Sequence, residues 1–148
     1  MPDASKQRST GGPASLAAAE WWDIIGALSL VLRVRLALWL APFQRVRKSF
    51  PPAAPAEPSN AGEHATVVRH AKAVRRAARL VPDASCLTKA LSLGTLLARK
   101  GIGCEVKIGV RKGAVGRLEA HAWVVHDGVV VIGGLPDLDT FSVIPRAV

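Results

Sequence analysis

The sequence contains few of the residues that mark disulfide-rich or metal-binding proteins. Among its 148 residues are two cysteines, one methionine, three phenylalanines and no tyrosine. The cysteines, Cys86 and Cys104, lack the spacing of a metal-binding CxxC pair and are too few for a disulfide framework. We therefore expect reduced thiols, no metal, no bound cofactor and a cytoplasmic location.

The chain also lacks an uninterrupted apolar run and a secretion signal. A spanning helix needs about 20 mostly apolar residues, whereas Asp23, Arg33 and Arg35 interrupt the apolar stretch at residues 16–50. The polar lead that contains Asp3 differs from the basic start of a signal peptide. The sequence therefore predicts neither secretion nor a simple transmembrane span.

Acidic residues are scarce, with 11 Asp and Glu against 20 Lys and Arg, which gives a formal net charge of +9. Such a charge attracts an acidic peptide, a membrane surface, a partner protein or nucleic acid, and charge alone does not distinguish them. Nucleic acid is the least favoured, because the basic residues of segment 63–81 are not interleaved with aromatic ones. We expect no nucleic-acid partner.

Composition divides the chain into four segments. Residues 1–15 are small and polar and are expected to form a disordered tail, whereas residues 16–50 form an apolar helical segment. Residues 51–62, PPAAPAEPSNAG, are a proline-rich linker, and residues 63–148 are the predicted folded domain.

Two interpretations of residues 16–50 stay open. The segment either packs on the adjacent domain or presents its apolar surface to a membrane or a partner protein. Its basic exit at Arg45, Arg47 and Lys48 suits an anionic surface, so a peripheral membrane association is one of the expectations. If the linker separates this segment from the domain, its removal should leave the domain folded.

Within residues 63–148 the sequence predicts an α+β fold. Apolar spacings of three and four predict helices at 63–81 and 86–100, and alternation predicts strands at 104–110 and 119–126. A short strand at 141–144 closes the sheet. Cys104 falls on the apolar phase of its strand and is interpreted as core.

The pair Asp127-Gly128 is a strong signal for a two-residue hairpin turn. With that turn His126 pairs with Val129, and the same register places His121 opposite Gly134. We interpret His126, like His64 and His70 in the helix predicted at 63–81, as a surface residue.

A candidate nucleophile and base lie on different predicted elements. Cys86 begins a helix that Ser85 can cap, and the free N–H groups there favour a thiolate and can stabilise an oxyanion. The alternative is that Cys86 is simply a small buried apolar residue. His121 lies in the strand AHAW, about 20 Å along that strand from Asp127, which is too far to orient it.

The carboxylates nearest Gly134 are therefore the candidates to orient His121. They are Asp137, our first choice, and Asp139, our second, both just beyond Pro136.

The order of these motifs resembles a known family. A cysteine at a helix start, a helix ending in KGIG, a strand reaching GVR, and AHAWVVHDG resemble the transglutaminase-like cysteine proteases of bacterial lasso-peptide (microcin-type) biosynthesis, which remove leader peptides. The resemblance covers about residues 63–144 and implies a papain-like core. It implies Cys86 as nucleophile and His121 as general base and acid. Family members often carry the third residue, an Asp, near the position where this chain has Gly133-Gly134.

The resemblance also implies partners. These are the lasso precursor peptide, a separate leader-recognition protein and an ATP-dependent macrolactam cyclase. The alternative function is a catalytically silent or acyl-transferring transglutaminase-like module that binds peptide or membrane.

Overall fold

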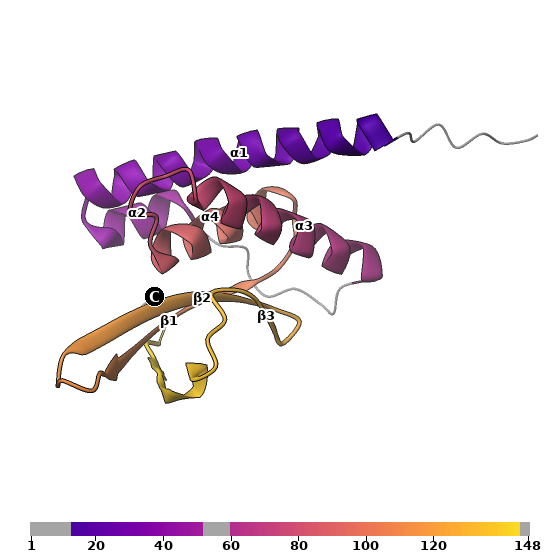
Figure 1. Cartoon of the computed structure of the whole chain (residues 1–148). Helices are drawn as coiled ribbons and strands as arrows, with labels where there is room; N and C mark the ends of the chain where they lie inside the picture. The colour runs from indigo at the N-terminus through magenta and orange to yellow at the C-terminus, as the bar shows by residue number, and fades with distance from the viewer. Residues whose placement is uncertain (1–12, 52–59, 146–148) are drawn as a thin grey trace, which may run out of the picture.

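The computed structural model describes residues 13–51 and 60–145. The predicted tail and linker lie largely outside this part of the chain. The described helices are α1 (Pro13–Leu40), α2 (Phe43–Ser49), α3 (Ala61–Ala78), α4 (Cys86–Arg99) and the 3₁₀ helix η1 (Leu138–Thr140), and the described strands are β1 (Glu105–Lys112), β2 (Leu118–His126), β3 (Val129–Ile132) and β4 (Ser142–Val143). The helices α1 to α4 lie together on one face of the small antiparallel sheet and η1 lies on the other, so the predicted α+β fold is confirmed (Figure 1).

The first helix is part of the core. Its residues Ala27 and Val31 are fully buried in one cluster with Val67 and Val74 of α3 and Leu93 of α4. The expectation that residues 16–50 stand apart from the domain therefore does not describe the packing. The alternative, in which the segment packs on the domain, describes it, because α1 buries one face against α3 and α4 (Figure 1).

The four-stranded sheet has the order β3-β2-β1-β4. Asp127 and Gly128 have φ values of 49° and 76°, which is the left-handed pair that a tight hairpin turn between β2 and β3 requires. The expected register holds for His126 with Val129, but a shift between Val124 and Val125 interrupts it. The prediction that His121 faces Gly134 is wrong, because the shift changes the register and β3 ends at Ile132.

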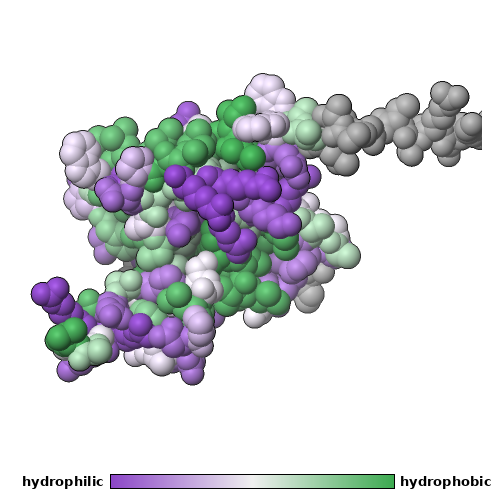
Figure 2. Space-filling view, in the orientation of Figure 1, coloured by the Kyte–Doolittle hydropathy of each residue, from purple (hydrophilic) through white to green (hydrophobic). Residues whose placement is uncertain are grey.

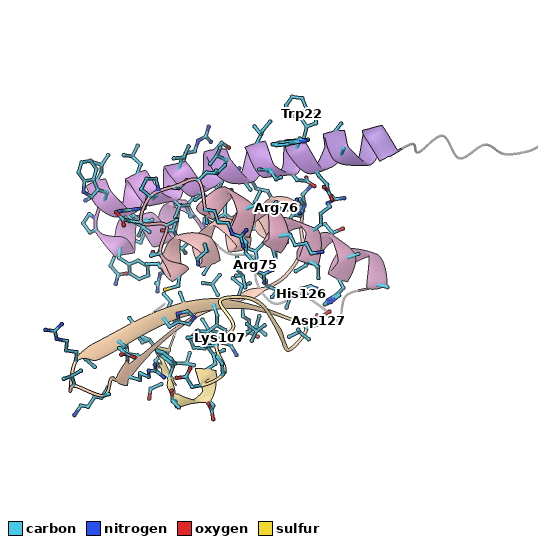
Figure 3. The ribbon with its side chains drawn as sticks, viewed as in Figure 1. Trp22, Arg75, Arg76, Lys107, His126 and Asp127 are labelled. Carbon is cyan, nitrogen blue, oxygen red and sulfur yellow. The ribbon has the colours of Figure 1, made fainter. Side chains whose placement is uncertain are left out.

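Two histidines that were interpreted as surface residues are buried. His126, labelled in Figure 3 beside Asp127, is 3% exposed. It stacks on the ring of His64 and places Nδ1 2.8 Å from the carbonyl oxygen of Gly103. His70 is 2% exposed within α3, and burial lowers its pKa. Both interpretations failed because neighbouring residues in the sequence do not show which face of an element another element covers.

The described helices include none that is both long and apolar enough to cross a membrane.

The buried and exposed faces of α1 give a matched stability test. Leu30 is 1% exposed, whereas Leu32, two positions on, is 49% exposed. We expect Leu30→Ala to lower the free energy of unfolding by about 2–5 kcal/mol, because it leaves a cavity. Leu32→Ala should change it by less than about 0.5 kcal/mol. Urea unfolding monitored by circular dichroism measures both, and equal small effects would show that α1 is not part of the core.

Candidate active site

Cys86 is the first residue of α4, as predicted. The Ser85 side chain accepts a hydrogen bond of 3.2 Å from the backbone N–H of Thr88, which fixes where the helix begins. Neither Cys86 nor Cys104 forms a disulfide, and Cys86 is partly exposed whereas Cys104 is buried at 2% exposure. Cys86 is therefore the thiol that a reagent or substrate reaches more easily.

His121 lies on the face of β2 that points away from the helices. Side chains alternate along a strand, and Ala122 and Val124 belong to the core beneath the helices. His121 and Trp123 occupy the opposite face, where their rings stack with centroids 6.1 Å apart. Phe141, from the segment before β4, packs against the imidazole with a centroid distance of 5.7 Å.

The backbone carbonyl of Gly133 holds the imidazole, with His121 Nε2 2.7 Å from its oxygen. A carbonyl oxygen only accepts hydrogen bonds, so Nε2 carries the proton and Nδ1 is the basic nitrogen. Gly133 has a φ of 78°, and a Cβ there would lie 2.5 Å from the carbonyl oxygen of Ala122. Only glycine fits this position, and its backbone carbonyl is the acceptor that holds the imidazole.

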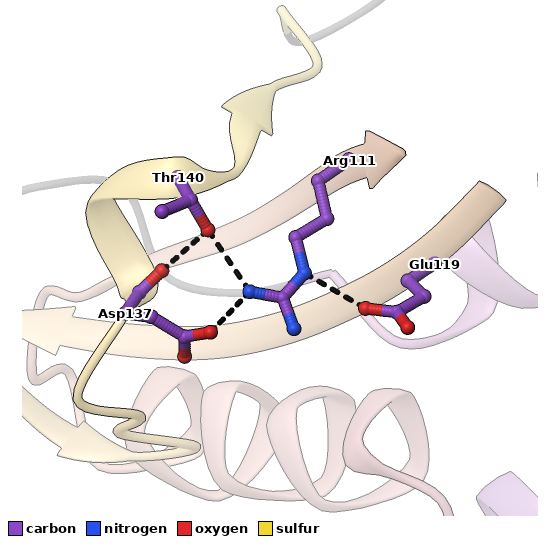
Figure 4. A network of polar contacts seen from close by, with 4 residues as sticks. All are labelled: Arg111, Glu119, Asp137 and Thr140. Carbon is purple, nitrogen blue, oxygen red and sulfur yellow. Dashed lines mark hydrogen bonds and ion pairs between the residues drawn. The ribbon is translucent and has the colours of Figure 1, made fainter. Parts of the chain in front are cut away.

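Asp137, the first-choice acid, binds Arg111. The Arg111 guanidinium donates to the Asp137 carboxylate, to Thr140 Oγ1 at 3.0 Å and to Glu119 Oε2 at 2.7 Å (Figure 4). The hydrogen bond from Arg111 lowers the pKa of Asp137, and Coulombic interactions with Arg111 and His121 lower it further. Asp137 therefore stays ionised, with Arg111 as its hydrogen-bond partner. Asp139 is exposed in η1.

Arg111 and Phe141 are site residues that the sequence reasoning missed. The guanidinium of Arg111 also lies 4.4 Å from the ring centre of Phe141. The sequence places Arg111 at the end of the strand GVR, on the same face as Gly109. Gly109 pairs with His121, so Arg111 lies on the His121 face of the sheet.

Cys86 and His121 lie toward the same end of α4 and β2. The turn after α4 contacts the other end of β2, through Gly103 and His126. From that contact Cys86 is about 20 Å back along the helix, and His121 is about 17 Å back along the strand that packs on it. The two side chains nevertheless have different neighbours. Cys86 packs against the core between the helices and the sheet, whereas His121 lies on the other face of the sheet, and no hydrogen bond in the described part of the chain joins them.

These observations define an α+β domain with a cysteine at a helix start and a histidine on the strand beneath that helix. The chain belongs to the transglutaminase-like superfamily, which it matches over residues 28–146. This superfamily includes cysteine peptidases. The match begins within α1, so it includes residues ahead of the predicted domain start at 63. No curated protein and no solved structure matches the chain.

Neighbouring glycines test the role of the Gly133 carbonyl. We expect Gly133→Ala to lower the free energy of unfolding by roughly 1–3 kcal/mol, because its φ is positive and its Cβ would meet backbone. Gly134→Ala should have little effect on stability, since a Cβ added at Gly134 would lie 3.7 Å from Val130 Cγ1, an ordinary contact. Thermal unfolding gives the stability, and the nitrogen-15 shifts of the His121 ring report whether Nε2 keeps its proton. Unchanged His121 shifts in Gly133→Ala would contradict the role of the carbonyl.

The Arg111–Asp137 pair gives a pH test. The pKa of Asp137 is lowered in the folded protein. The pair therefore stabilises the fold fully at pH values above 3.8, the ordinary pKa of this carboxyl group. That contribution is lost as the pH falls through the lowered folded value. We expect the melting temperature of the wild type to exceed that of Asp137→Asn at neutral pH. The difference between the two melting temperatures should narrow in acid. Asp139→Asn, at an exposed position, is the control and should show no such pattern.

Proposed function

We propose that this protein is a cytoplasmic cysteine peptidase that cleaves the leader from a ribosomally made lasso-peptide precursor. The observation that carries the proposal is Cys86, a partly exposed thiol at the first position of a capped helix in a transglutaminase-like domain. The resemblance of AHAWVVHDG and its surrounding motifs to leader peptidases supports the choice of substrate.

In the proposed mechanism, His121 Nδ1 takes the proton of the Cys86 thiol, and the thiolate attacks the carbonyl carbon at the junction of leader and core. The free N–H groups at the start of α4 stabilise the oxyanion. The imidazolium then protonates the departing core amine, which leaves the leader as a thioester on Cys86. Water, deprotonated by His121, hydrolyses this thioester and restores the thiol.

This mechanism requires the His121 ring to approach the start of α4. The pairing of β2 supports such an approach. β3 pairs with β2 only from Val124 to His126, so the backbone edge of β2 beside His121 has no β3 partner. The Gly133 carbonyl lies at that edge and accepts the Nε2 proton. The ring also packs against Trp123 and Phe141, so in the proposed mechanism it leaves these two contacts to reach the thiol.

Asp137 remains our proposed acid, with Asp139 second. The hydrogen bond from Arg111 lowers the pKa of the Asp137 carboxyl group, so the carboxylate is ionised and supplies a negative charge on this face of the sheet. Because the Gly133 carbonyl shares the orienting role, we expect Asp137→Ala to reduce the cleavage rate modestly. Asp127→Ala, at the hairpin turn, should reduce the rate less, and precursor cleavage monitored by mass spectrometry compares the two. A larger loss from Asp127→Ala would contradict the assignment.

The partners that we propose are the precursor, a separate leader-recognition protein and an ATP-dependent macrolactam cyclase. A short precursor, a recognition protein and an asparagine-synthetase-like cyclase encoded beside this chain would support this pathway and supply the substrate for the assays.

The central prediction concerns the thiol. Cys86→Ala and His121→Ala should each abolish cleavage of the precursor while keeping the circular dichroism spectrum of wild type. Cys104→Ala should retain cleavage, because Cys104 is a buried core residue. Full activity in Cys86→Ala would refute the peptidase.

A second measurement needs no precursor. Iodoacetamide should alkylate Cys86 near neutral pH faster than Cys104, and His121→Ala should slow the alkylation of Cys86. Equal, slow alkylation of both cysteines would favour the catalytically silent module instead.

A further inference from the structure

The face of α1 that points away from α3 and α4 is apolar and exposed. Seven large side chains on it are about half exposed or more, and we call them the outer stripe: Trp21, Trp22, Ile25, Leu32, Leu36, Trp39 and Leu40. Figure 2 shows apolar surface along this helix, and Trp22 projects outward from it in Figure 3. No described element covers the stripe.

Helical geometry makes these residues one continuous surface. At about 100° per residue, all seven positions fall within about 100° of the helix circumference. From Trp21 to Leu40 the stripe is about 29 Å long. The opposite side of the helix carries Ala27, Val31 and Val34, which are fully buried. The helix therefore has two apolar faces, of which the domain uses one.

Basic residues border the outer stripe. On one edge an open hollow between α1 and α3 combines Trp21, Ile24 and Leu80 with Arg76 and Arg79. Glu20 also lines it and lies 3.9 Å from Arg76, so Arg79 is the cation there without an acidic residue of the hollow paired to it. Leu80 is 68% exposed and extends the apolar surface there.

The other edge and the end of the stripe are also basic. Arg33 lies about 20° beyond the stripe on the helix circumference and is exposed. Past the end of α1, the exposed side chains of Arg45 and Lys48 lie on α2. The apolar stripe is therefore bordered by cations on both edges, with more cations beyond its end.

We propose that the outer stripe binds the surface of an anionic lipid membrane, with α1 lying flat on it. Tryptophans stand near both ends of the stripe, and their rings favour the boundary between acyl chains and headgroups. The surrounding arginines and lysines are complementary to anionic headgroups.

Charge also favours an anionic lipid surface over a second copy of the chain as the partner of the outer stripe. A second copy carries the same net charge of +9 and the same basic border, so two stripes repel each other as they meet. An acidic protein would satisfy the charge, but a flat stripe of this length with tryptophans near its two ends favours a planar lipid surface. The proposal is independent of the cysteine chemistry.

The test is co-sedimentation of the full chain with two kinds of vesicle, phosphatidylcholine alone and phosphatidylcholine mixed with phosphatidylglycerol. We expect binding to the mixed vesicles that weakens as salt is raised. Leu36→Glu places a charge in the stripe and should weaken binding by at least roughly tenfold. Leu118→Glu is the matched control, because Leu118 is exposed at the start of β2, away from the stripe, and it should bind as wild type does.

Several results would overturn the proposal. Equal binding to both vesicle types would remove the anionic preference, and an equal loss in Leu118→Glu would remove the stripe as the site. Absence of vesicle binding would overturn it, and a dimer in analytical ultracentrifugation that Leu36→Glu dissociates would then assign the stripe to a second copy. Circular dichroism melting of both variants confirms that neither result comes from unfolding.

Discussion

The burial of α4 is the constraint on which the rest of the domain depends. Leu93 and Leu97 are fully buried, and the helix packs against α1, α3, β1 and β2. A helix surrounded in this way cannot shift along its axis without disturbing several contacts. Its first residue, Cys86, is consequently held by the packing of the helix, and Cys86 also contacts the core cluster directly. The position of the candidate nucleophile is thus a property of the core, and α1 contributes to that core.

The candidate base depends on a second, smaller packing unit on the other face of the sheet. Trp123 and Phe141 lie over Gly109, where a Cβ would come within 2.9 Å of both side chains. Arg111 joins this unit to the segment after β3 by binding Asp137 and Thr140. That segment also carries Gly133, whose carbonyl holds the imidazole. The aromatic rings and the arginine therefore act on His121 indirectly, by fixing the course of the backbone that contacts it.

The two proposals use different faces of the molecule. The proposed peptidase site combines the start of α4 with the edge of β2, whereas the outer stripe lies on the face of α1 that points away from α3 and α4 (Figure 1). Because one face of α1 is buried in the core and the other is exposed, a membrane-bound chain would keep its catalytic core intact. Such an arrangement would leave the sheet face that carries His121 pointing away from the lipid.

The sequence by itself determined the features that depend on neighbouring residues. Ser85 caps the helix that Cys86 begins, and Asp127-Gly128 forms the hairpin turn, because a cap and a tight turn are decided within a few residues. Only the tertiary structure decided which faces are covered and which side chains meet. The alternation of β2 predicted its two faces but did not reveal that His126 is buried against α3 or that the register shifts beyond Val125. The pairing of Arg111 with Asp137 spans 26 residues, and the burial of α1 joins residues on both sides of the predicted linker. Contacts of this kind depend on how whole elements pack, which no local pattern encodes.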